Sequence, residues 1–179
     1  MAARADLKPD TGLPAKVHPS PNHGERRDGR RPDMLMLHYT GMPDAAGALA
    51  RLCDPTSGVS SHYLLLEDGR ILQLVPEARR AWHAGAGAWG GDQDINSCSI
   101  GIEIVHPGHE GGLPAYPDAQ IEAAIALSRD IVERWSIPPE RVLGHSDISP
   151  DRKEDPGENF PWERFHAAGI GHWVAPAPI

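Results

Sequence analysis

The chain has 179 residues, of which 40% are hydrophobic, and a formal net charge of −8. This length and apolar content fit one globular domain with its own core and exclude a disordered chain. The acidic balance argues against nucleic-acid binding, which requires a basic surface. No apolar run in the sequence is long enough to span a membrane.

Residues 1–33 are predicted to form an irregular arm. The stretch from Met1 to Pro32 is polar, contains five prolines and lacks the apolar core of a secretory signal. Basic and acidic residues alternate from Glu25 to Asp33 without a helix or strand period. We therefore expect a cytoplasmic protein, or a periplasmic one if an export signal has been removed, with a folded domain over residues 34–179.

The first predicted elements follow this arm. Residues 34–39 form an apolar run that is typical of a buried strand, and residues 45–52 predict a short helix. Asp68-Gly69 lies between apolar runs at residues 62–67 and 70–75. This pattern indicates a β-hairpin with a type I′ turn, in which both central residues have positive φ.

The second half alternates between the two kinds of element. Residues 99–105 predict a strand with Glu103 on one face, and residues 118–135 carry the apolar stripe of an amphipathic helix. A short strand at 141–143 and a helix at 160–168 follow. This order predicts an α/β or α+β fold with a single central mixed sheet flanked by helices.

A long polar segment at residues 144–157 is the strongest candidate for a functional site. It begins with His145 at a strand end and closes with Asp155-Pro156-Gly157, and another histidine, His38, ends the strand at residues 34–37. If the two strand ends adjoin, two imidazoles and one carboxylate can meet, which suits a catalytic zinc site with an open fourth position. A strand-end histidine is more often an ordinary surface or hydrogen-bonded residue, so spacing alone leaves both interpretations open.

Three other patterns suggest different chemistry. The segment Gly85–Gly90 matches a dinucleotide fingerprint, but it lacks the preceding strand and the following helix. His145-Ser146-Asp147 contains the residue types of a catalytic triad, although sequence neighbours on a turn rarely converge. Cys98 has no cluster of cations or helix N-terminus beside it in sequence that would activate a thiol.

Six short segments occur in order between about residues 34 and 162. They are Leu37-His38-Tyr39-Thr40, Ser61-His62-Tyr63-Leu64 with Asp68-Gly69, Arg80-Ala81-Trp82-His83-Ala84-Gly85, Ser99-Ile100-Gly101-Ile102-Glu103, Gly144-His145-Ser146-Asp147 and Arg152-Lys153-Glu154-Asp155-Pro156-Gly157. Together they resemble the type-2 N-acetylmuramoyl-L-alanine amidases, the AmpD/AmiD family related to peptidoglycan recognition proteins. Residues 1–33 have no counterpart in this resemblance, and residues 41–60 add little about the substrate.

The resemblance implies a zinc centre and two catalytic side chains. The implied zinc ligands are His38, His145 and Asp155. Glu103 would act as the acid/base, and Lys153 would supply a cation that stabilises the transition state. The implied activity is zinc-dependent hydrolysis of the amide bond between N-acetylmuramic acid, or its anhydro form, and L-alanine in peptidoglycan or muropeptides.

The substrate side of the resemblance concerns aromatic residues and histidine. His83 falls where relatives line the substrate cleft, and Tyr39 and Trp82 are further candidates for substrate binding. Trp82 and Trp89 are candidates for contact with a sugar ring. The alternative function is a peptidoglycan-binding module without catalysis, as some relatives of this fold are. The presence of both implied catalytic side chains and all three implied ligands favours the enzyme. The sequence does not define the stem-peptide specificity or an oligomeric state.

Overall fold

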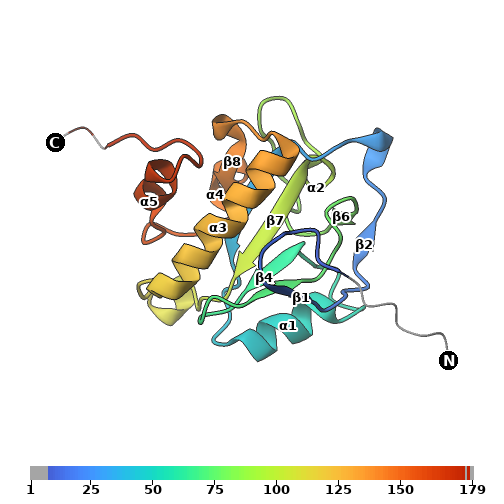
Figure 1. Ribbon diagram of the computed structural model, residues 1–179, viewed down its shortest axis with the longest axis horizontal. Coiled ribbons are helices and arrows are strands. Elements are labelled where there is room, and N and C mark those ends of the chain that lie inside the picture. The colour runs from blue at the N-terminus through green and yellow to red at the C-terminus, as the bar shows by residue number, and fades with distance from the viewer. Residues whose placement is uncertain (1–7, 176, 178–179) are drawn as a thin grey trace.

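A six-stranded mixed sheet lies at the centre of the computed structural model, which describes residues 8–175 and 177 (Figure 1). In spatial order the strands are β1 (Ala15–Val17), β5 (Ile71–Gln73), β4 (Tyr63–Leu65), β7 (Ser99–Ile104), β3 (Met34–Tyr39) and β8 (Val142–Gly144). Only the pair β4 and β5 is antiparallel among these neighbours. The predicted fold class, a mixed central sheet flanked by helices, is confirmed.

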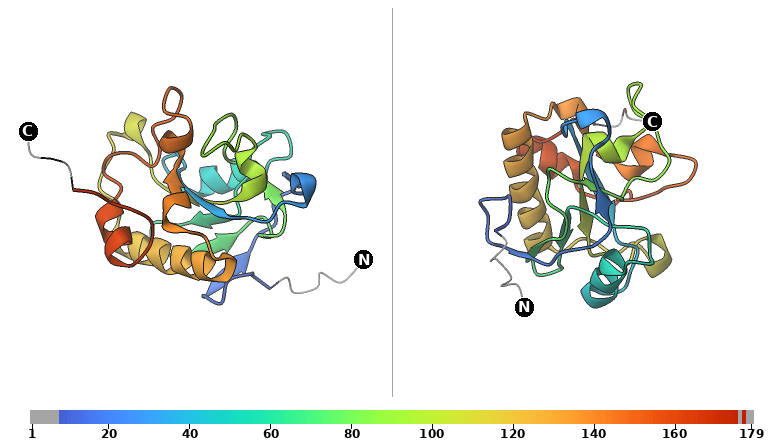
Figure 2. Two further views of the ribbon diagram at one scale, coloured as in Figure 1. Left: turned by 90° about the horizontal axis from the view of Figure 1, so that it is seen from above. Right: turned by 90° about the vertical axis from the view of Figure 1, so that its right-hand side faces the viewer.

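Helices cover both faces of the sheet (Figure 2). The helix α3 (Asp118–Trp135) packs its apolar stripe on one face, and α5 (Trp162–Ala167) adds to the same core cluster. The other face is covered by α1 (Ala45–Cys53), α2 (Ile95–Cys98) and α4 (His145–Ile148). The interior strand β3 therefore reads as a continuous apolar run rather than an alternating one, since both of its faces are buried.

The hairpin between β4 and β5 is confirmed, with Leu65 opposite Ile71. The predicted type I′ turn is wrong, because Gly69 has positive φ and Asp68 does not. The N–H of Gly69 donates to the carbonyl of Leu66, and the N–H of Leu66 donates to the carbonyl of Arg70. This pattern is a three-residue loop that ends in a left-handed glycine, the next most common hairpin connection.

The segment before residue 34 differs from the irregular arm that its sequence predicts. It contains β1, which extends the sheet by pairing in parallel with β5, and β2 (His23–Gly24), which pairs with β6 (Arg80–Ala81). A short 3-10 helix, η1 (Arg27–Gly29), leads into β3. Strands of two or three residues are too short to show a hydrophobic period, and a partner strand distant in the sequence defines them.

The sheet also determines where the polar segments meet. Because β7, β3 and β8 are parallel neighbours, their carboxyl ends lie at one edge, where His38 is opposite Glu103 and Leu37 is opposite Gly144. The 3-10 helices η2 (His109–Gly111) and η3 (Pro139–Arg141) lie in the connections that follow β7 and precede β8. Among the helices of the described residues, none combines the length and apolarity needed to cross a bilayer.

Candidate metal centre and cleft

Three potential ligand atoms converge at the carboxyl edge of the sheet. His38 Nδ1 lies 3.0 Å from His145 Nδ1 and 2.9 Å from Asp155 Oδ2, and His145 Nδ1 lies 3.1 Å from the same carboxylate oxygen. All three side chains are buried. The structure thus brings together the three residues that the resemblance implies as ligands: His38 from β3, His145 from the first position of α4, directly after the neighbouring strand β8, and Asp155 from the loop after α4.

Gly144 allows this loop to approach the sheet. A Cβ at Gly144 would lie 2.6 Å from Pro156 Cδ, so any larger residue would push the loop away. The N–H of Ser146 donates to the backbone carbonyl of Asp155 at 3.0 Å and ties the loop to the start of α4. These contacts hold the Asp155 carboxylate beside His145.

The protonation of the group favours a bound cation. His145 Nε2 lies 2.8 Å from the carbonyl oxygen of Ala84, which only accepts hydrogen bonds, so Nε2 carries a proton and Nδ1 is the ring nitrogen available to a cation. A lone pair and a carboxylate 3.1 Å apart repel one another unless a cation lies between them, and two nitrogens with one oxygen suit a transition metal.

Glu103 and Lys153 line the cleft beside this group. Among the described residues, no group hydrogen-bonds Oε2 of Glu103, although this atom is buried. Burial raises the pKa of Glu103 well above its usual value, the nearby Asp155 carboxylate raises it further, and Lys153 opposes the shift. An unpaired carboxyl group with a raised pKa in a cleft is typical of a group that exchanges protons with a ligand.

The cleft has a volume of about 400 Å³ and is bordered by all three predicted substrate-contact residues, Tyr39, Trp82 and His83. Four further residues that no sequence pattern predicts also line the cleft: Arg51, Ser60, His109 and Glu110. They come from α1, from the chain before β4 and from the loop after β7, and nothing in their local sequence marks them. The hydroxyl of Tyr39 contacts His109 Nδ1 at 2.9 Å, which joins that loop to the end of β3.

His83 borders the cleft, but both of its ring nitrogens contact protein groups. Nδ1 lies 3.0 Å from His38 Nε2, and Nε2 lies 3.2 Å from the hydroxyl of Ser99. Burial, together with His38 and other nearby cationic groups, holds the pKa of His83 well below its usual value, so the ring is neutral. Trp89 lies elsewhere, at a separate cavity that Trp162 and Trp173 also border.

The alternative motifs have structural roles. The glycine-rich loop at residues 85–90 is bound to the Asp155 loop, since the side chain of Arg152 donates to the carbonyl of Ala86 at 2.6 Å. The Asp147 carboxylate accepts from the N–H of Gly144 at 2.8 Å and is not aligned with His145 as in a triad. Burial raises the pKa of Cys98 to about 11, which leaves its thiol protonated at neutral pH.

Comparison with known sequences identifies the family. Residues 28–158 match the family described as N-acetylmuramoyl-L-alanine amidase. The chain belongs to this amidase family. The predicted family is therefore confirmed, and the matched residues include the three ligand candidates, Glu103 and Lys153.

Two curated members of the amidase family and one solved structure show the extent of the similarity. The chain is 43% identical over 152 residues to the N-acetylmuramoyl-L-alanine amidase AmiD of Escherichia coli K12, covering 78% of this chain and 54% of AmiD. It is 34% identical over 171 residues to the 1,6-anhydro-N-acetylmuramyl-L-alanine amidase AmpD of Enterobacter cloacae, covering 86% and 89% of the two chains. The structure of E. coli AmiD in complex with the substrate anhydro-N-acetylmuramic acid-L-Ala-D-gamma-Glu-L-Lys gives a TM-score of 0.75 at 44% identity, over 80% of this chain and 59% of that chain. The amidase chain thus spans a little over half the length of AmiD and most of the length of AmpD.

Proposed function

We propose that this amidase is a zinc enzyme that hydrolyses the amide bond between N-acetylmuramic acid, or its anhydro form, and L-alanine. The convergence of His38, His145 and Asp155 supports this proposal most strongly, because His145 and Asp155 also line the cleft. Zinc accepts two imidazole nitrogens and one carboxylate oxygen as ligands and keeps a fourth position open in its catalytic sites. The complex of AmiD with an anhydro-muropeptide supports the choice of substrate.

The three ligands would hold the metal, which polarises a carbonyl and lowers the pKa of a bound water from 15.7 toward about 7. Glu103 then has the role of proton carrier. Its Oε2 would take a proton from the attacking water and return it to the departing nitrogen of L-alanine, which requires a carboxyl group that is neither paired nor strongly acidic. The environment of Glu103 supports both conditions.

Lys153 would stabilise negative charge on the carbonyl oxygen of the substrate as that charge develops. Its side chain lines the same cleft and lies two residues before Asp155 on the loop that closes the site. A fixed cation at this place interacts more strongly with the transition state than with the neutral amide. A non-catalytic binding module needs neither this lysine nor the Glu103 carboxyl group, so we favour the enzyme.

We further propose that the substrate is a recycled fragment and not intact cell wall, and that the activity belongs to the cytoplasm. AmpD, whose length this chain nearly spans, is named for the anhydro form of the sugar. Turnover of an anhydro-muropeptide should therefore exceed turnover of polymeric peptidoglycan at equal concentrations of the amide bond. Preference for the polymer would contradict the fragment proposal, and fractionation of cells would test the compartment.

The decisive experiment measures metal and hydrolysis on the same preparation. We expect about one zinc per chain, release of the L-alanine peptide from a muropeptide, and loss of both zinc and turnover in His145→Ala. As a matched control, His18→Ala changes an exposed histidine before β2 and should alter neither property. Full activity in metal-free protein would overturn the zinc proposal, and metal binding without hydrolysis would favour the binding module.

A further inference from the structure

A chain of hydrogen bonds starts at His38 and ends at a main-chain carbonyl. The hydroxyl of Ser99 lies 2.6 Å from the carbonyl oxygen of Ile95, which only accepts, so the hydroxyl proton is donated there. The contact of 3.2 Å between this hydroxyl and His83 Nε2 then needs a proton on Nε2. In the tautomer with this proton, Nδ1 of His83 is an acceptor, and the contact of 3.0 Å with His38 Nε2 is a hydrogen bond that His38 donates.

The direction of this chain determines which nitrogen His38 presents to the other ligands. With its proton on Nε2, His38 has a free lone pair on Nδ1, the atom that lies 2.9 Å from Asp155 Oδ2. His145 reaches the same state through a different acceptor, because its Nε2–H donates to the carbonyl of Ala84 at 2.8 Å. The adjacent residues His83 and Ala84 thus support one imidazole ligand each.

This dipeptide is held in place by groups outside the cleft. The side-chain oxygen of Asn96 accepts from the N–H of His83 at 3.0 Å and from the N–H of Ala84 at 2.9 Å. The absence of a side chain at Gly101 makes room for the ring, since a Cβ there would lie 2.6 Å from atoms of His83. The arrangement leaves His83 no free ring nitrogen for a substrate, although the ring borders the cleft.

We propose that His83 is a positioning residue for the metal: it accepts the Nε2 proton of His38 and fixes that ring with Nδ1 toward Asp155 and His145. Outer hydrogen-bond partners of this kind fix the tautomer and orientation of a ligand, and their loss weakens metal affinity by roughly 10- to 100-fold. The inference rests on the proposed zinc site, and it replaces the substrate contact expected of His83. Asn96 and Ser99 hold His83 in this position.

A matched pair of variants tests the acceptor on His83. His83→Asn places an oxygen near the position of Nδ1, whereas His83→Leu has a similar size and no acceptor. We expect the zinc dissociation constant, measured against a chromophoric chelator, to rise by roughly 10- to 100-fold in His83→Leu and to recover most of that change in His83→Asn. With cobalt in place of zinc, the absorption bands should shift in His83→Leu and stay close to those of the parent in His83→Asn.

Steady-state kinetics at saturating zinc separate this role from substrate binding. A positioning role leaves KM near that of the parent in His83→Leu. A raised KM together with unchanged zinc affinity and an unchanged cobalt spectrum would overturn the inference and identify His83 as a substrate contact. A parent protein that binds no zinc would instead refute the proposed function itself, so the two failures are distinguishable.

A measurement on the unaltered protein keeps the inference testable if a variant fails to fold. In the zinc-loaded protein, the ring ¹⁵N signals should show His83 protonated on Nε2 and bare on Nδ1. The opposite tautomer would mean that His38 has no acceptor at this position, and the inference would fail. The spectrum of His83→Asn, in which these signals are missing, identifies them.

Discussion

At the scale of single residues, Glu103 lines the cleft beside His145 and Asp155 and has a carboxyl oxygen that no described residue hydrogen-bonds. Glu103→Gln preserves the shape of the side chain and removes its ability to accept a proton. We expect the variant to keep its zinc and to lose at least about two orders of magnitude in kcat, the usual size of a general acid–base contribution. The measurements are kcat and zinc content, with Glu67→Gln as a control at an exposed carboxylate. Hydrolysis at the parent rate would exclude the proton-transfer role.

Lys153 tests whether charge at the cleft acts on the transition state. Lys153→Ala should lower kcat by about a hundredfold, near 3 kcal/mol, with little change in KM and none in zinc content. The control Lys16→Ala removes an equal charge from the exposed face of β1. Near-normal kinetics would identify an ordinary solvated lysine. Loss of zinc along with activity would show that Lys153 orders the Asp155 loop, and the catalytic assignment would then be withdrawn.

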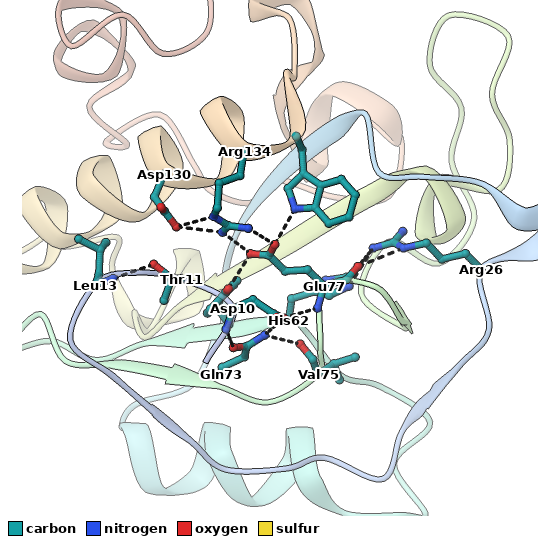
Figure 3. A network of polar contacts seen from close by, with 12 residues as sticks. Asp10, Thr11, Leu13, Arg26, His62, Gln73, Val75, Glu77, Asp130 and Arg134 are labelled. Atoms are coloured by element: carbon teal, nitrogen blue, oxygen red, sulfur yellow. Dashed lines mark hydrogen bonds and ion pairs between the residues drawn. The ribbon is translucent and has the colours of Figure 1, made fainter. Parts of the chain in front are cut away.

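At the scale of elements, a buried carboxylate holds the end of α3 on the sheet (Figure 3). Glu77, 1% exposed, accepts from Arg134 Nη1 at 2.5 Å and Nη2 at 2.7 Å, from Trp135 Nε1 at 2.5 Å and from the hydroxyl of Tyr63 at 2.6 Å. Its backbone N–H donates to the carboxylate of Asp10 at 2.8 Å. One side chain therefore joins the last turn of α3, the start of β4 and the N-terminal segment.

This arrangement predicts a large loss of stability in Glu77→Ala. Removal of the Glu77 carboxylate leaves the Tyr63 hydroxyl without its acceptor and takes away the buried partner of Arg134, which costs about 3–5 kcal/mol in a buried pair. Asp130 binds the same guanidinium at 2.9 Å from a more exposed position, so Asp130→Ala should cost less than about 1 kcal/mol. Urea unfolding of the two variants measures the difference. Equal losses would show that Glu77 contributes no more than a surface ion pair.

At the scale of the whole molecule, Arg26 makes the N-terminal segment part of the fold. Its buried guanidinium donates to the carbonyls of Glu77, Ser97 and Asn96, with the shortest contact at 2.7 Å. Burial lowers the pKa of Arg26 to about 10, so the group stays charged at neutral pH. One of these residues, Asn96, also holds His83 and Ala84 through its side chain, and these two residues contact the proposed ligands His38 and His145.

We therefore expect Arg26→Met to destabilise the whole protein and to affect the metal site indirectly. The loss should be about 2–4 kcal/mol in the free energy of unfolding, because several buried carbonyls lose their donor. Lys16→Met removes an equal charge from an exposed position and should change stability by less than about 0.5 kcal/mol. Thermal and urea unfolding check both values. A neutral effect of Arg26→Met would mean that the buried guanidinium does not stabilise the folded domain.

The sequence by itself determined the elements that carry their own periodicity. The strand at residues 34–39 and the helix at residues 118–135 appear in the structure with the predicted bounds, since a buried run and an apolar stripe are properties of a single segment. The family resemblance, carried by six ordered motifs, named the residues that converge at the carboxyl edge of the sheet. Composition alone supplied only the weaker observation that histidines and a polar loop suit a metal.

Tertiary structure decided the features that join segments far apart in the chain. β1 forms because its backbone pairs with the strand β5. His38 contacts Asp155, 117 positions away in the sequence, and His83, 45 positions away. The orientation of His83 depends on a hydroxyl, a glycine and a carbonyl from other segments, none of which has a local signal. A short-range pattern reports which face of a segment is buried, whereas hydrogen-bond direction at a site depends on which groups packing brings within about 3 Å.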